Sequence, residues 1–206
     1  MSLQYLKSLN PTFDHPFIHE LKVYAKKHHV PIITDEGVHF IIQLLKINKA
    51  KKVLEIGTAI GYSAILMSFF ANVEVWSIER DRDMFELAQK NIQNMNLTNQ
   101  IHLIHGDAKE IDLLDTQFDM IFIDAAKAAY IDFFNRYNLM LKKGGLIISD
   151  NLLFRGQVAH PENIESKNRK QLIKKIDRFN QFVVKQANYD TYIYAIGDGM
   201  SVSIKK

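Results

Sequence analysis

The chain has 206 residues, of which 47% are hydrophobic and 24% are charged. These proportions are those of an ordinary globular domain, and they exclude a predominantly disordered chain. Cysteine is absent, which excludes a disulfide framework, a thiolate zinc site and a cysteine nucleophile. The net charge of +3 permits a polyanionic partner but does not require one.

The length predicts one domain over residues 1–206, with N-terminal helices over 1–50 and a sheet domain over 51–206. The longest nearly apolar stretch, 64–71, is far shorter than the roughly 20 residues of a membrane-spanning helix. The N-terminus does not resemble a signal peptide. We therefore expect a soluble, cytoplasmic protein with no membrane partner.

Helices and strands are predicted in turn along the chain. Apolar residues recur at helical spacing over 38–45, after the capping candidates Thr34 and Asp35. Short runs typical of strands follow at 52–56, 74–79, 101–104, 118–123 and 145–149. Helical spacing recurs between them. Such alternation indicates a mostly parallel sheet with helices on both faces, an α/β fold.

The C-terminal part follows another pattern. A helix is predicted over about 165–187, with an apolar face of Leu172, Ile176, Phe179 and Val183. Two alternating runs, 192–196 and 200–204, then flank the turn Gly197-Asp198-Gly199. Asp-Gly between such runs is typical of an antiparallel hairpin. The sheet is therefore expected to end in an antiparallel C-terminal hairpin.

A glycine turn follows the first predicted strand. Gly57 and Gly61 lie between Glu55 and Ser63, where open α/β sheets bind ligands. Glycine allows the backbone to approach such a ligand closely. The turn is not a P-loop, because no lysine follows Gly61, and Ala59 replaces the second glycine of the dinucleotide fingerprint.

Acidic residues also end the next two strands. Glu79 ends the second and can accept both hydroxyls of a ribose. Asp107, between Gly106 and Ala108, follows the third and could meet an adenine amino group. Alternatively, the glycines only close tight turns and Glu79 is a solvated loop residue. Three acidic residues at successive strand ends, Glu55 included, favour a nucleotide-type site.

Oxygen-bearing side chains follow the fourth and fifth strands. Asp124 ends the fourth, and Asp150 and Asn151 end the fifth. We expect these strands to be neighbours, so two carboxylates and an amide converge on one rim. Such hard oxygens suit Mg²⁺, Mn²⁺ or Ca²⁺ and argue against zinc. The alternative is a helix cap or turn at Asp150 and Asn151.

These motifs resemble a known family. The pattern of Glu55, Gly57, Gly61, Tyr62 and Ser63, followed by Glu79 and by Gly106-Asp107-Ala108, is similar to the S-adenosylmethionine-binding motifs of class I methyltransferases. More narrowly, it resembles the cation-dependent O-methyltransferases that include the catechol and caffeoyl-CoA enzymes. The resemblance covers nearly the whole chain. It implies a Rossmann-like sheet of seven strands with a reversed last strand, and a homodimer.

The resemblance also implies roles for individual residues. The expected cofactor is S-adenosylmethionine, with Ile33, Glu55, Gly57, Ser63, Glu79, Asp107, Ala108 and Asp124 as its binding residues. The expected cation is Mg²⁺ or Mn²⁺, with Asp124, Asp150 and Asn151 as ligands. Lys127 and Asp124 are the expected catalytic residues. Lys127 would lie near the acceptor hydroxyl, either as a base or as an electrostatic partner of the site's carboxylates.

The acceptor is suggested by three further segments. Residues 122–127, 150–158 and 169–180 resemble the bacterial branch that methylates 5-hydroxyuridine at the tRNA wobble position, giving 5-methoxyuridine. A 5-hydroxyuracil has a carbonyl beside its hydroxyl, so it could chelate a cation as a catechol does. The candidate tRNA-binding residues are Arg155, Lys167, Lys170, Lys174 and Arg178, of which the last four share one helix face.

Alternatives remain for both the helix and the function. The basic face could simply be solvated. The protein could instead be a small-molecule catechol-type O-methyltransferase, or a non-catalytic S-adenosylmethionine- or RNA-binding protein. The joint presence of Asp124, Lys127, Asp150 and Asn151 disfavours the non-catalytic alternative.

Overall fold

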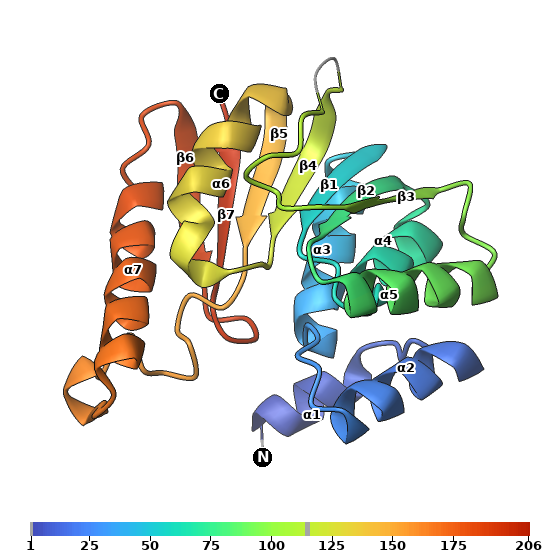
Figure 1. Cartoon of the computed structure of the whole chain (residues 1–206), viewed down its shortest axis with the longest axis horizontal. Coiled ribbons are helices and arrows are strands. Elements are labelled where there is room, and N and C mark those ends of the chain that lie inside the picture. The colour runs from blue at the N-terminus through green and yellow to red at the C-terminus, as the bar shows by residue number, and fades with distance from the viewer. Residues whose placement is uncertain (1, 114–115) are drawn as a thin grey trace.

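A seven-stranded sheet forms the centre of the computed structural model, which describes residues 2–113 and 116–206 (Figure 1). The strands are β1 (Lys52–Ile56), β2 (Glu74–Glu79), β3 (Ile101–His105), β4 (Phe118–Ile123), β5 (Leu141–Ser149), β6 (Tyr189–Tyr194) and β7 (Met200–Lys205). Their order is β3-β2-β1-β4-β5-β7-β6. β1 to β5 are parallel, whereas β7 runs antiparallel to β5 and β6 antiparallel to β7. The predicted fold class is therefore confirmed.

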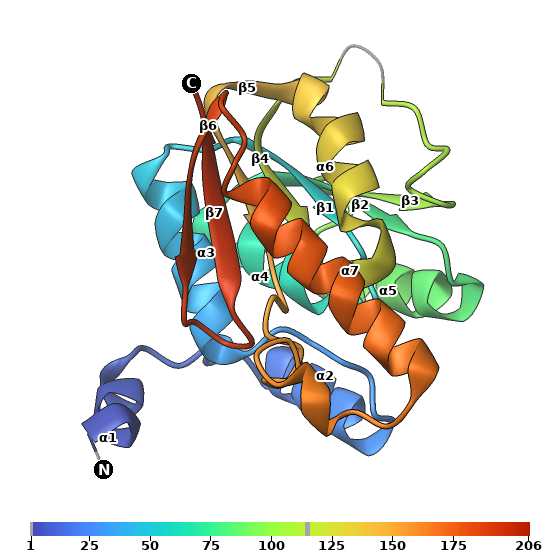
Figure 2. The ribbon, with the colours of Figure 1, turned by 90° about the vertical axis from the view of Figure 1, so that its left-hand side faces the viewer.

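Helices flank this sheet and precede it. They are α1 (Ser2–Leu9), α2 (Pro16–Lys27), α3 (Asp35–Ile47), α4 (Tyr62–Ala71), α5 (Arg82–Asn94), α6 (Tyr130–Tyr137) and α7 (Lys167–Val183), with the short 3-10 helices η1 (Lys127–Ala129), η2 (Asn138–Met140) and η3 (Pro161–Asn163). α3 begins where its capping residue predicts, because the Thr34 hydroxyl accepts a hydrogen bond from the Gly37 N–H at 3.2 Å. Figure 2 shows α1 set apart from the rest of the chain.

The two faces of the sheet bury separate cores. Successive side chains of a strand point to opposite faces. Val53 and Phe122 pack with α2, α3, α4 and α5, while Leu54 and Ile121 pack with α6 and α7. All four side chains are fully buried, and burial of each stabilises the fold by about 1.5–3 kcal/mol. This double burial explains why the central strands are almost continuously apolar.

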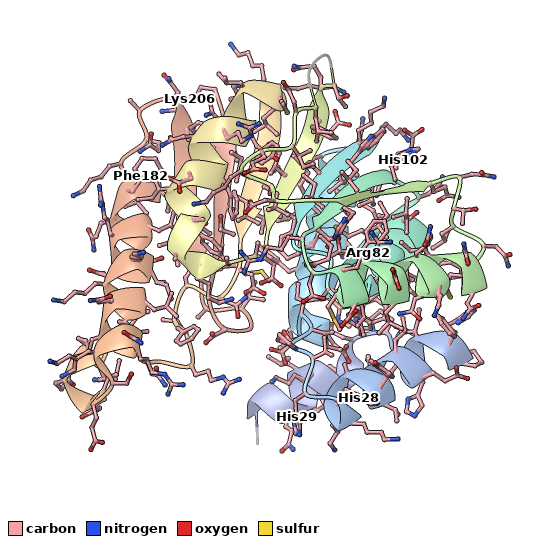
Figure 3. The ribbon with its side chains drawn as sticks, in the orientation of Figure 1. His28, His29, Arg82, His102, Phe182 and Lys206 are labelled. Carbon is pink, nitrogen blue, oxygen red and sulfur yellow. The ribbon has the colours of Figure 1, made fainter. Side chains whose placement is uncertain are left out.

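α7 differs from its prediction in length and in its buried face. It begins at Lys167 and ends at Val183, so it is shorter than predicted at both ends. Ile173 is buried, whereas Leu172, predicted for the apolar face, is half-buried. At the upper end of α7 in Figure 3, the ring of Phe182 meets Phe134 of α6, with 5.5 Å between centroids. These contacts fix α7 beside α6.

The C-terminal hairpin brings its turn to the carboxyl end of β5. β6 begins three residues earlier than predicted, at Tyr189. β7 pairs antiparallel with β5, so Ser201 lies opposite Ser149, the last residue of β5. The turn before β7 must therefore lie beside the segment that follows β5. A backbone hydrogen bond of 2.8 Å from the Leu153 N–H to the Asp198 carbonyl joins the two segments.

Among the described residues, no helix is both long enough and apolar enough to cross a bilayer.

Candidate active site

A cavity of about 550 Å³ lies at the carboxyl ends of the parallel strands. β1 and β4 are neighbours in the sheet, so the strand order reverses between them. In open α/β sheets this reversal marks the place where ligands bind. The cavity is also within the size range of small-molecule sites. Its walls come from the strand ends, from α7 and from the turn before β7.

The glycine turn after β1 allows two backbone segments to meet in the cavity floor. Gly57 has φ +100°, a conformation that other residues rarely adopt. A Cβ added to Gly57 would lie 2.3 Å from the backbone oxygen of Asp124. Gly61, with φ +85°, is the N-cap residue that precedes α4. The turn therefore requires glycine both for its φ angle and for its contact with the end of β4.

Two carboxylates are held at the cavity by neighbouring backbone groups. The Glu79 oxygens accept hydrogen bonds from the N–H groups of Ala59 and Asp81, each at 2.8 Å. One oxygen of Asp107 accepts from the N–H of Lys109 at 2.8 Å. A carboxylate has lone pairs for further donors. Both side chains are thus positioned to accept hydrogen bonds from ribose hydroxyls or an amino group.

Glu55 lies beneath the cavity instead of on its wall. Its side chain is fully buried and accepts hydrogen bonds from the hydroxyls of Ser63 and Ser77. Burial raises the pKa of the Glu55 carboxyl to about 8, although the two hydroxyls oppose the rise. Ser63 does line the cavity, so its hydrogen bond joins Glu55 to the cavity wall. A direct contact between Glu55 and the cofactor stays a prediction.

The other predicted cofactor residues converge on this cavity. It is lined by Ile33, Gly57, Ser63, Glu79, Asp107, Ala108 and Asp124. These residues come from the segment before α3 and from the ends of β1, β2, β3 and β4. The structure therefore brings them together, and their contacts with a cofactor stay predictions.

The predicted metal ligands lie together in the same cavity. The Asn151 side-chain amide donates to Asp124 Oδ1 at 2.8 Å, and the Asn151 backbone N–H donates to Asp150 Oδ1 at 2.6 Å. Asn151 has φ +64°, which turns the chain back after β5. In the described part of the chain, the second oxygen of each carboxylate and the amide oxygen of Asn151 receive no hydrogen bond. Three oxygens thus remain for a ligand.

The electrostatics of this set fit a hard cation. Burial raises the pKa of Asp124, while the nearby Lys127 and the Asn151 amide lower it. Burial also raises the pKa of the Asp150 carboxyl to about 7, and repulsion from Asp124 adds to the rise. A divalent cation would offset both effects by favouring the ionised carboxylates. Among the described residues no group of three His, Cys, Asp or Glu side chains could hold a metal, so the set consists of two carboxylates and an amide.

Lys127 and Tyr130 support the two aspartates. Lys127 lines the cavity at the start of η1, and its charge lowers the pKa of both Asp124 and Asp150. The buried Tyr130 hydroxyl donates to the backbone oxygen of Asp150 at 3.1 Å. Sequence reasoning did not find Tyr130, because its spacing in α6 is that of any core aromatic residue.

The predicted tRNA-binding residues lie outside the cavity. Four side chains of α7 and one of the loop after β5 are exposed, and none of them is among the described residues that line it: Lys167, Lys170, Lys174, Arg178 and Arg155. The Arg155 backbone N–H donates to the two carboxylate oxygens of Asp198, at 2.7 and 2.9 Å.

Lys175 and Asp198 line the cavity, but neither was predicted as a site residue. For Asp198 a signal was present in the sequence. A hairpin whose second strand pairs antiparallel with β5 must place its turn at the carboxyl end of β5. The position of Lys175 at the cavity depends on the orientation of α7, which the helical spacing alone does not determine.

Comparison with known proteins identifies the family. The family model described as O-methyltransferase matches residues 7–206. The chain belongs to this family. It is 33% identical over 181 residues to a catechol O-methyltransferase of Niastella koreensis, covering 81% of this chain and 79% of that protein. It is 28% identical over 190 residues to a caffeoyl-CoA O-methyltransferase of Populus kitakamiensis, covering 88% and 80% of the two chains.

A solved structure agrees with this assignment. A Staphylococcus aureus protein that has been assigned as a caffeoyl-CoA O-methyltransferase superposes with a TM-score of 0.90 and 36% identity, covering 99% of this chain and 97% of that one. The prediction of an O-methyltransferase of the caffeoyl-CoA and catechol type is therefore confirmed.

Proposed function

We propose that this protein transfers the methyl group of S-adenosylmethionine to the 5-hydroxyl of 5-hydroxyuridine at the tRNA wobble position, giving 5-methoxyuridine. One observation carries the proposal. A single cavity joins a nucleotide-type half, with Glu79 and Asp107, to an oxygen-rich half, with Asp124 and Asp150. The donor and the acceptor can therefore meet inside it, and the exposed basic face of α7 lies beside it.

The oxygen-rich half fits Mg²⁺ or Mn²⁺, which Asp124, Asp150 and Asn151 would hold. Such a cation favours the oxyanion form of a bound hydroxyl and fixes its orientation. Methyl transfer is an in-line displacement, in which the acceptor oxygen bonds to the methyl carbon as the bond to sulfur breaks. The acceptor hydroxyl also loses its proton, and S-adenosylhomocysteine is the second product.

The chain itself orients the reactants and handles the proton. Glu79 and Asp107 would hold the donor, and the backbone hydrogen bonds that fix their carboxylates support this role. Holding both reactants in one geometry is itself a large part of catalysis. Lys127 lies near both Asp124 and Asp150. In its neutral form it would accept the hydroxyl proton, and as the ammonium it would stabilise the resulting oxyanion.

A small-molecule acceptor is the second candidate function. The Niastella and Populus relatives are named for catechol and caffeoyl-CoA as acceptors. A catechol and a 5-hydroxyuracil would present similar oxygen pairs to the same cation, so the metal set does not distinguish them. The basic face of α7 disfavours a simple catechol, which carries no phosphates, but tRNA and the coenzyme A of caffeoyl-CoA both carry them. The resemblance of residues 150–158 and 169–180 to the tRNA-modifying branch is what favours tRNA. A non-catalytic binding protein would not need the combined carboxylate, amide and lysine set.

A direct comparison of acceptors tests the proposal. The purified protein, with S-adenosylmethionine and Mg²⁺, is given tRNA bearing 5-hydroxyuridine, the same tRNA without the hydroxyl, or catechol. We expect 5-methoxyuridine in the nucleosides of the first tRNA and no methylation of the second. Methylation of catechol without methylation of hydroxylated tRNA would show that the tRNA assignment is wrong. Loss of 5-methoxyuridine from cells lacking the protein is the matching expectation in vivo.

Two further expectations accompany this function. We propose that the protein acts as a homodimer in the cytoplasm, where tRNA is modified. The edge strand β6 leaves Tyr192 66% exposed and Ile193 48% exposed, and such apolar edge residues suit an interface between subunits. Light scattering coupled to size-exclusion chromatography would give the mass of the particle, and a monomeric mass would contradict the dimer.

A further inference from the structure

Lys175 differs from the other basic residues of α7. It lines the cavity together with Lys127, Asp150 and Asn151, although α7 begins and ends well outside it. α7 packs against η1, the short helix that begins with Lys127. Because Lys127 also lines the cavity, we infer from this contact that Lys175 belongs to the oxygen-rich half, where the acceptor would enter.

The charge of Lys175 is available to a ligand. Lys127 has Asp124 and Asp150 close enough to affect their pKa values. Lys175, by contrast, forms no hydrogen bond or ion pair with any residue in the described part of the chain. A positive charge in a cavity without a protein partner attracts an anionic group of a ligand. The carboxylate of Asp198, which also lines the cavity, does not pair with Lys175. It accepts hydrogen bonds from the backbone N–H of Arg155.

Positive charge continues from Lys175 to the surface. Residues three or four apart on a helix are surface neighbours, with Cβ atoms about 5–6 Å apart. Arg178 is three residues after Lys175, and Lys174 is four residues before Arg178. Lys174 and Arg178 are exposed. Lys175 is exposed as well as lining the cavity. The charges therefore form a row from the rim of the cavity along the outer face of α7, which suits a chain of phosphates better than a single carboxylate.

We propose that Lys175 binds a backbone phosphate next to the nucleotide that is being methylated. The inference depends on the proposed tRNA function and makes it more specific. The base would enter among Asp124, Asp150 and Asn151, and its phosphate would meet the Lys175 ammonium. Lys175 thereby selects a nucleotide over a simple phenol, because catechol offers no anion at this position. Lys175 is a specificity-determining residue and takes no part in the bond changes.

Kinetics with graded acceptors test this role. The acceptors are 5-hydroxyuridine as the nucleoside, 5-hydroxyuridine with 3′ and 5′ phosphates, and catechol. For the wild type we expect a KM for the bisphosphate about tenfold below that for the nucleoside, the order of one charge-assisted hydrogen bond. Lys175→Gln should raise the KM of the bisphosphate about tenfold more than the KM of the nucleoside, with kcat little changed. Lys175→Arg should keep the preference, because it keeps the charge.

Lys143→Gln is the matched control. Lys143 is an exposed lysine near the start of β5, at the opposite end of that strand from the cavity. Its substitution makes the same change of charge and size, so its kinetics should follow the wild type. An unaltered phosphate preference in Lys175→Gln would overturn the inference. An equal loss of activity with all three acceptors would overturn it too, because it would indicate a structural role.

Binding at different salt concentrations gives a second, independent measurement. The probe is an anticodon stem-loop without the 5-hydroxyl, bound in the presence of S-adenosylhomocysteine. Loss of one phosphate contact in a single strand lowers the slope of log affinity against log salt by about 0.7. We expect that change in Lys175→Gln and no change in Lys143→Gln. Identical slopes for the two variants would contradict the phosphate contact.

The outcomes also separate this inference from the proposed function. If the wild type methylates catechol but neither form of hydroxyuridine, the proposed function is wrong, and so is the proposed role of Lys175. If nucleoside and bisphosphate are methylated with equal KM values, the proposed function stands and the role of Lys175 is wrong.

Discussion

The two halves of the cavity are built in different ways. In the cofactor half, Glu79 and Asp107 each accept a hydrogen bond from a backbone N–H two residues further along the chain. In the acceptor half, the walls come from segments far apart in the sequence, and Asp198 is joined to Arg155 across 43 residues. Both halves also hold contacts of the other kind, since Glu79 accepts from the Ala59 N–H 20 residues away and Asp150 accepts from its neighbour Asn151. The difference is that the cofactor half is formed at the turns that follow parallel strands, whereas α7 and the hairpin turn reach the acceptor half through tertiary packing.

This difference bears on specificity within the family. A half positioned by strand-turn-helix geometry can stay unchanged when other segments vary. A half formed by α7, the loop after β5 and a hairpin turn can change its acceptor without disturbing the donor site. Relatives named for catechol and caffeoyl-CoA fit this view. Variants that alter one half at a time can therefore test whether the two halves are independent.

Gly57→Ala should have the largest effect, because both halves meet at this residue. The new Cβ would lie 2.3 Å from the backbone oxygen of Asp124, and alanine would also have to adopt a φ of +100°. We expect loss of cofactor binding and of turnover, with destabilisation of more than about 2 kcal/mol. Calorimetric titration of S-adenosylmethionine and thermal unfolding measure the two effects.

Gly144→Ala separates the clash from the backbone strain. Gly144 also has a positive φ, +74°, but an added Cβ there meets nothing within 4 Å. The substitution should lower the free energy of unfolding by about 1–2 kcal/mol through backbone strain alone, and cofactor binding should stay intact. Equal behaviour of the two variants would show that the contact between Gly57 and Asp124 is unimportant.

Asp150→Asn should damage the acceptor half and spare the cofactor half. The substitution keeps the shape of the side chain and removes one of the two carboxylates facing the metal position. We expect turnover to fall at least a hundredfold, with S-adenosylmethionine affinity changed less than threefold, since removing one ligand charge leaves the donor contacts intact. EDTA should stop the wild type, and Mg²⁺ or Mn²⁺ should restore it. Full activity in excess chelator would exclude a cation requirement.

Charge reversal on α7 should weaken the binding of tRNA without affecting the binding of S-adenosylmethionine. Lys170→Glu combined with Lys174→Glu removes two candidate phosphate contacts from an exposed face. We expect tRNA affinity to fall about tenfold or more and its salt slope to decrease by about 1.4, twice the value for one single-strand contact. Filter binding at several salt concentrations measures both.

The control for this variant carries the same change of charge elsewhere. Lys46→Glu with Lys143→Glu alters two exposed lysines away from the cavity. Its salt slope should match that of the wild type. If both double variants lose affinity equally, the effect comes from net charge, and α7 is not the docking face.

The sequence predicted the cofactor half better than the acceptor half, for a physical reason. Gly57, Glu79 and Asp107 follow strands whose ends are visible as apolar runs, and parallel strands place those ends at one rim. The pair Asp124 and Asp150 followed in the same way once β4 and β5 were neighbours. Lys175 could not be found like this, because its place depends on how α7 is rotated against η1.

Glu55 shows what the position of a residue in a strand does not predict, even in the cofactor half. Its place at the end of β1 suggests a cofactor contact, but strand side chains alternate between faces and depths, and this one points into the interior. There it meets the hydroxyls of Ser63 and Ser77. The spacing of residues along a strand indicates which end they occupy, and it does not say which of them reach the surface of the cavity.

Glu55→Gln should have the smallest effect, a change in how stability depends on pH. In the folded protein the pKa of Glu55 is raised from 4.5 to about 8, chiefly by burial. Between those values the folded state binds more protons than the unfolded state, so stability falls as pH rises from about 4.5 to 8. Glutamine does not titrate. The Tm of the variant should therefore decrease less over this range, by a few degrees, in scans without cofactor at pH 5, 6, 7 and 8.

Glu74→Gln, at an exposed position, is the control and should keep the wild-type dependence of Tm on pH. Parallel profiles for all three proteins would mean that Glu55 ionises as readily in the folded chain as in the unfolded one, and the buried hydroxyls of Ser63 and Ser77 would then be holding a charged carboxylate beneath the donor site.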